Sequence, residues 1–122
     1  MLIEYFKLSA QIVIALSIYN VWFFRFNKPT KYRAKNSKSM KEEFSHYGLP
    51  NFFVWAIGFL KVTLATMLIV GIFYNQLIFP AALAMAVLMF GAILMHLKVK
   101  DTAIKSLPAA IFLILSLSIA FL

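Results

Sequence analysis

The sequence of 122 residues contains no cysteine and only four acidic residues. The absence of cysteine excludes disulfides, thiol catalysis and cysteine-ligated clusters within this chain. All four acids lie outside the long apolar stretches: Glu4, Glu42, Glu43 and Asp101. The apolar stretches therefore offer no carboxylate for a proton or cation relay. The sequence is rich in apolar residues: 63% of the residues are hydrophobic and only 13% are charged.

This apolar excess predicts an integral membrane protein, because so small a soluble domain cannot bury so much apolar surface. Four apolar stretches are long enough, or nearly so, to cross about 30 Å of hydrocarbon as helices. We expect these spans at residues 6–26, 50–73, 77–97 and 107–122. Strands are excluded, since an open sheet would leave unpaired edges in lipid. The expected fold is an all-α membrane four-helix bundle, a single domain over residues 1–122.

The basic residues gather on one side of the expected spans. Seven of the 12 lysines and arginines lie between Arg25 and Lys41, and three more lie between Lys98 and Lys105. On the opposite side there is only Lys7. The positive-inside rule then predicts a multi-pass protein with both termini outside.

The first basic segment has two functional interpretations. Its cations are expected to contact anionic lipid headgroups, and a docking surface for a soluble partner is the alternative. The residues concerned are Arg25, Lys28, Lys31, Arg33, Lys35 and Lys38. Nucleic acid is not expected as a partner despite the net charge of +8, because no recognition module accompanies the charge.

The same segment predicts a short helix. Ser39-Met40-Lys41-Glu42 fits a capping box, and Gly48 fits a helix stop. Between them Met40, Phe44 and Tyr47 recur at i, i+4 and i+7. We expect a short amphipathic helix lying on the cytoplasmic membrane interface.

Lys61 is the one charged residue deep inside an expected span, because Lys7 and Arg25 lie at the two ends of the first span. It lies about 16 Å along the second span, near the bilayer midplane. An acid of the chain is not expected nearby, so three outcomes stay open. Lys61 sits neutral, snorkels toward an interface, or pairs with an anion from a lipid, ligand or partner.

Polar residues of the first span reach the depth of Lys61 and are candidate ligand contacts: Ser17, Tyr19 and Asn20. Their alternative role is hydrogen bonding between helices. His96 ends the third span and is either an interfacial histidine or a proton-handling or quinone-bonding residue. A metal site is not expected, because His46, His96 and Asp101 lack helical ligand spacing.

The order of these segments resembles the DoxX-like family of small four-helix membrane proteins. The resemblance is carried by SKSMKEEFSHYGLP leading into IGFLKVTLATMLIVG, and by GAILMHLKVKD followed by KSLPA. It covers residues 6–122. In that family the second span usually has an acidic residue where this chain has Lys61, which puts an inherited acid–base role in doubt.

The resemblance implies a membrane subunit linked to quinone-dependent oxidoreductases or redox-stress complexes. We therefore expect an accessory subunit of the bacterial inner membrane, with no catalytic residue of its own, that holds a quinone or lipid in the bundle. Redox-enzyme subunits and further copies of the chain are the expected partners. A non-catalytic assembly factor and a small oligomeric transporter are the alternatives.

Overall fold

The computed structural model describes residues 1–122 and contains helices, turns and loops but no strands. Four helical segments are long and apolar enough to cross a membrane: Leu2–Phe24, Asn51–Val70, Asn75–Lys98 and Ala103–Phe121. The expected all-α bundle of four membrane-spanning helices is confirmed. The first of them begins earlier than expected, because the helix continues through the charged residues Glu4 and Lys7.

The five α-helices are α1 (Leu2–Tyr19), α2 (Met40–His46), α3 (Asn51–Val70), α4 (Ile78–Lys98) and α5 (Leu107–Phe121). A π-helical segment, Asn20–Phe24, prolongs α1. Such wide turns alter the register of the side chains that follow them. Short 3₁₀ turns lie at Ala34–Asn36, Asn75–Leu77 and Ala103–Ser106.

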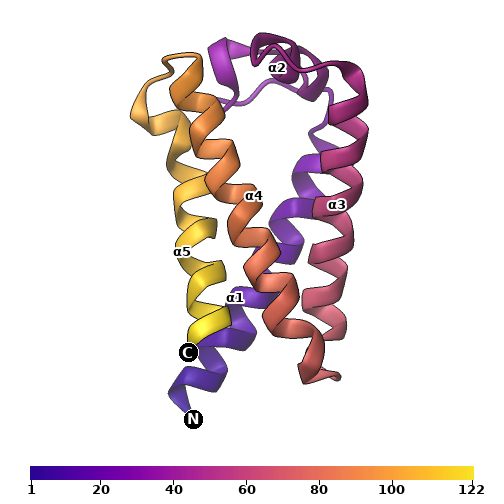
Figure 1. The fold of residues 1–122 in the computed structure, drawn as a ribbon, viewed down its shortest axis with the longest axis vertical. Helices are drawn as coiled ribbons and strands as arrows, with labels where there is room; N and C mark the ends of the chain where they lie inside the picture. Colours follow the sequence, from indigo (N-terminus) through magenta and orange to yellow (C-terminus); the bar gives the residue numbers. More distant parts are fainter.

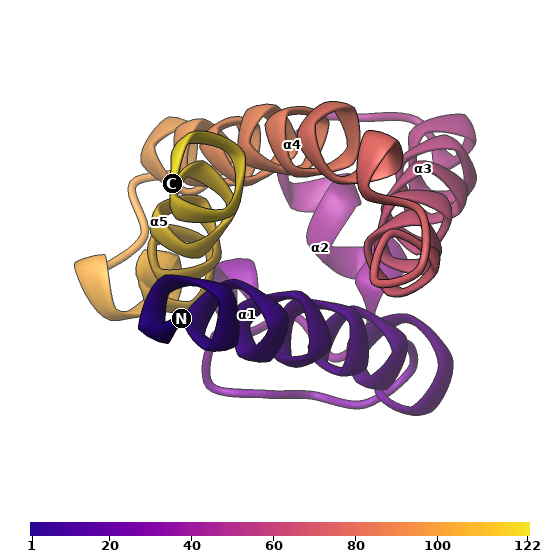
Figure 2. The same cartoon turned by 90° about the horizontal axis from the view of Figure 1, so that it is seen from below.

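The two ends of the bundle differ in what they carry (Figure 1). The chain termini and the α3–α4 turn lie at one end. The other end has two basic loops: residues 25–50, which include α2, and residues 98–106. We call the second end the basic end. The helix α4 starts beside α3 at the tight turn and ends beside α5 at the basic end (Figures 1 and 2). The helices α3 and α4 therefore separate toward the basic end.

Small side chains allow the helices to approach closely in the interior. Ala15, Ala65 and Ala82 are fully buried on three different helices. Polar side chains of α1 add hydrogen bonds to α3. Gln11 Nε2 donates to the Leu68 carbonyl at 2.8 Å, and the Tyr19 hydroxyl lies 2.7 Å from Thr66 Oγ1.

The short helix expected after Ser39 is present as α2. Ser39 Oγ accepts a hydrogen bond from the Glu42 amide at 3.1 Å, as a helix N-cap should. The chain leaves α2 at Gly48, whose φ of +80° favours glycine. The expected position of this helix on the membrane interface is not supported, because its apolar face is buried within the protein. Met40, Phe44 and Tyr47 cover the basic end of the bundle.

Candidate functional site

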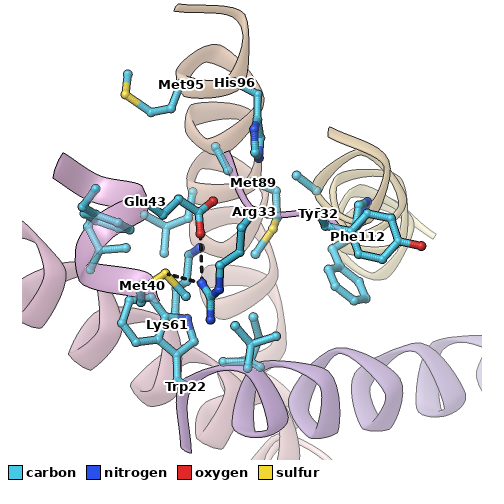
Figure 3. Close-up of a pocket in the computed structure, with 18 of the residues that line it drawn as sticks. Trp22, Tyr32, Arg33, Met40, Glu43, Lys61, Met89, Met95, His96 and Phe112 are labelled. Carbon is cyan, nitrogen blue, oxygen red and sulfur yellow. Dashed lines mark hydrogen bonds and ion pairs between the residues drawn. The ribbon is translucent and has the colours of Figure 1, made fainter. Parts of the chain in front are cut away.

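A cavity of about 940 Å³ lies beneath α2 and the first basic loop. This volume is at the upper end of the range of about 300–1,000 Å³ that is typical of ligand pockets. Residues of all four long helices line it, and most of the lining is apolar. Polar groups reach it from three directions: Lys61 from α3, His96 from α4, and Arg33 and Glu43 from the loop and α2 (Figure 3).

Lys61 borders this cavity without an ionic or hydrogen-bonding partner in the chain. Its Nζ lies 5.8 Å from the centroid of the Trp22 ring, a cation–π arrangement. The indole can lie there because α3 has glycine at position 58. A Cβ at Gly58 would overlap the ring, with Trp22 Cε3 only 2.6 Å away.

The first basic loop, with α2, covers the cavity at the basic end, and we call it the roof. Arg33 and Glu43 form a buried ion pair in it. Arg33 Nη1 lies 3.0 Å from Glu43 Oε2, and both side chains are almost completely buried. Arg33 also donates to the carbonyls of Arg25, Phe26 and Lys28, so its guanidinium is satisfied by the loop that it closes. A buried pair needs such additional hydrogen bonds to offset its desolvation.

Tyr47 completes this roof. Its hydroxyl donates to Glu43 Oε1 at 2.8 Å. Burial, together with the adjacent Glu43 carboxylate, raises the pKa of Tyr47, which keeps the phenol protonated and able to donate. The Glu43 carboxylate thus accepts hydrogen bonds from Arg33 and Tyr47, and it is not available as a counter-ion for Lys61. The expectation that no acid of the chain lies near Lys61 was incorrect in one respect, since Glu43 lines the same cavity.

His96 and Asp101 form a second polar pair at the edge of the cavity. His96 Nδ1 lies 2.8 Å from Asp101 Oδ2, and the Lys35 amide donates to Asp101 Oδ1 at 3.0 Å. Burial opposes ionisation of Asp101, but the hydrogen bonds from His96 and Lys35 outweigh it and lower the pKa of this carboxyl. An ionised Asp101 accepts a proton-bearing Nδ1, which leaves Nε2 of His96 without a partner in the chain.

Lysines of the second basic loop hold the first loop over the cavity. Lys105 Nζ donates to the Arg33 carbonyl at 2.7 Å and to Asn36 Oδ1 at 2.9 Å. Lys98 Nζ donates to the Tyr47 carbonyl at 2.9 Å. These cations therefore fasten the two basic loops to each other.

The structure brings together most of the predicted ligand contacts. Ser17, Asn20, Lys61 and His96 all line the cavity. Tyr19 does not, because its hydroxyl bonds with Thr66 on the α1–α3 contact. Their role in binding stays a prediction.

The predicted lipid-contacting cations fall into two groups. The side chains of Arg25, Lys28, Lys31, Lys35 and Lys38 are exposed at the basic end. Arg33 departs from the expectation, because its side chain is 3% exposed and bonded to Glu43 inside the protein. Sequence reasoning missed this pair, although Glu43 follows Met40 by three residues and so shares the buried face of α2.

The model of the DoxX-like family matches residues 15–119 of this chain. The chain belongs to the DoxX-like family. Searches of curated proteins and of solved structures gave no match. In this DoxX-like protein the matched region includes both polar pairs and every residue that lines the cavity.

Proposed function

We propose that this DoxX-like protein holds a lipid-borne amphiphile, a quinone or a lipid, as the accessory subunit of a redox-linked membrane assembly. The observation that carries the proposal is the cavity, which is mainly apolar yet contains polar groups without partners, two of which matter most here. These are Nζ of Lys61 and Nε2 of His96. A large apolar pocket with a few convergent polar groups is the usual form of a small-molecule site.

The position of Lys61 favours a ligand over a partner helix. A partner's acidic residue in the membrane would have to reach Nζ from outside the bundle. Lys61 instead lines the central cavity beside Trp22. An assembly factor that pairs through Lys61 is therefore the weaker alternative.

We also propose that the basic end faces the cytoplasm of a bacterial inner membrane. The exposed lysines around the roof support this, because cytoplasmic loops carry the excess of basic residues. Anionic headgroups of the inner leaflet would then surround the roof of the cavity.

The direct test is to purify the protein in a mild detergent and to quantify co-purified quinone and lipid by mass spectrometry. Lys61→Met and His96→Gln should each reduce the bound amount at least severalfold. Lys38→Met and His46→Gln serve as matched controls, because both side chains are exposed outside the cavity. Equal ligand content in all four variants would overturn the proposal.

The assembly role is tested in membranes of a strain that lacks the native protein. Quinone-dependent dehydrogenase activity should fall in the deletion strain and return with the wild-type chain but not with Lys61→Met. Unchanged activity in the deletion strain would remove the redox-linked role and leave ligand binding to be judged by the extraction alone.

A further inference from the structure

Residues of α3 and α4 line one side of the cavity. Phe53 and Ile57 line it from α3, and Val87 and Gly91 line it from α4. Two of these residues are exposed, Phe53 at 39% and Val87 at 65%. The two helices separate toward the basic end (Figure 1).

Gly91 shows how open this side is. A Cβ built on Gly91 would meet no atom within 4 Å, whereas one built on Gly58 would overlap Trp22. Gly91 is therefore not required for close packing between helices. It borders open space, which we call the opening.

The charges along the cavity are unbalanced. Its basic lining residues are Arg25, Lys31, Arg33, Lys61 and Lys105, and its only acidic one is Glu43. Glu43 is already bonded to Arg33, Tyr47 and the Ala34 amide. Lys105 is bonded to the first basic loop. Lys61 is the deepest of the cations and has no anion.

We propose that the ligand is a single-chain amphiphile with an anionic headgroup, a carboxylate or a phosphate, which enters from the bilayer between α3 and α4. Its headgroup binds Lys61, and its chain lies past Gly91 and Val87 in the opening. This inference rests on the proposed function, because it needs a ligand in the bundle. It goes further in selecting an anion over a neutral quinone, since an anion stabilises the charged form of an otherwise unpaired lysine.

Trp22 provides the readout, because its indole lies beside Lys61. The chain has two tryptophans, and Trp55→Phe removes the other, which is 58% exposed. The protein is reconstituted in phosphatidylcholine nanodiscs and titrated with brominated stearate, brominated lysophosphatidate or the matched brominated fatty alcohol. Bromine quenches tryptophan at short range, so saturable quenching reports binding in the cavity.

We expect the acids to quench Trp22 at concentrations at least tenfold lower than the alcohol. The tighter of the two acids identifies the source, a free fatty acid or a phospholipid. Lys61→Met should remove the preference for acids, Lys61→Arg should keep it, and Lys7→Met, at the far end of α1, should not alter it. Gly91→Leu should weaken binding of all three probes by filling the opening.

Three results would count against the proposal. Equal binding of the alcohol and the acids would overturn the anionic headgroup but leave the proposed ligand site intact. A preference for acids that persists in Lys61→Met would overturn the role of Lys61. The absence of saturable quenching by any probe, or by a brominated quinone, would overturn both this inference and the proposed function.

Discussion

At the scale of single residues, Gly58 and Gly91 show that two helical glycines can have different structural roles. Gly58 lies against the face of the Trp22 indole, which fills the space that a side chain would need. Gly91 borders open space. The first glycine is a packing requirement, and the second is part of a cavity wall.

Gly58→Ala is therefore expected to destabilise the protein. The added methyl group must displace the indole, and overpacking of this kind costs about 1–3 kcal/mol of unfolding free energy. The measurement is the thermal unfolding midpoint in detergent. Gly91→Ala is the control and should leave the midpoint unchanged or slightly raised, because alanine favours the helix. Equal losses in both variants would contradict the assigned contact.

At the scale of elements, the two basic loops act as one unit. Asp101 of the second loop accepts hydrogen bonds from His96 and from the Lys35 amide of the first loop. Lys105 donates in the opposite direction, from the second loop to carbonyls of the first. The roof of the cavity is thus fastened at several points to residues more than 60 positions away in the sequence.

The lowered pKa of Asp101 makes this fastening dependent on pH. Because the folded-state pKa lies below the ordinary value of about 3.9, ionised Asp101 contributes stability above that value. The contribution is lost as the pH falls through the folded-state pKa. Asp101→Asn should lower the free energy of unfolding by about 1.5–3 kcal/mol at neutral pH. In strong acid the variant and the wild type should have the same free energy of unfolding.

Thermal unfolding across a pH series measures this difference, and hydrogen exchange in residues 25–50 shows where it acts. Glu42→Gln is the matched control, because Glu42 is exposed and lies 3.8 Å from His46. A pH dependence that survives in Asp101→Asn would assign the effect to another group.

The sequence was sufficient to predict the helices, because each long apolar run leaves a bilayer-spanning helix as the only structure that satisfies the backbone. It also predicted the cap at Ser39 and the helix stop at Gly48, since both depend on local chemistry. The depth count placed Ser17 and Asn20 at the level of Lys61, and the structure gives all three a shared cavity.

The roof could not be predicted in the same way. Arg33 and Glu43 look like ordinary loop charges until the loop folds back over the bundle, and their pairing depends on that tertiary arrangement. Tyr19 was predicted to lie near Lys61 from its depth in the membrane, but depth does not show on which face of the helix a side chain lies. Its hydroxyl bonds with Thr66, whereas Asn20, in the π-helical segment that follows, borders the cavity.

At the scale of the whole molecule, the asymmetry of charge makes the proposed orientation testable. Because the chain contains no cysteine, Lys38→Cys and Asn75→Cys each introduce a single thiol, one at each end of the bundle. A membrane-impermeant maleimide added to intact cells should label Asn75→Cys and leave Lys38→Cys unlabelled until the membrane is disrupted. The reverse pattern would contradict a cytoplasmic basic end.

The hydrogen bonds between the two basic loops also set the order in which this end of the protein can fold during synthesis. The Arg33–Glu43 pair can form once the chain up to Glu43, little more than a third of its length, has left the ribosome. Asp101 and Lys105 arrive only after the third span has been made, because synthesis proceeds from the N-terminus. In a nascent chain the first basic loop therefore stays unfastened until the second basic loop has been made.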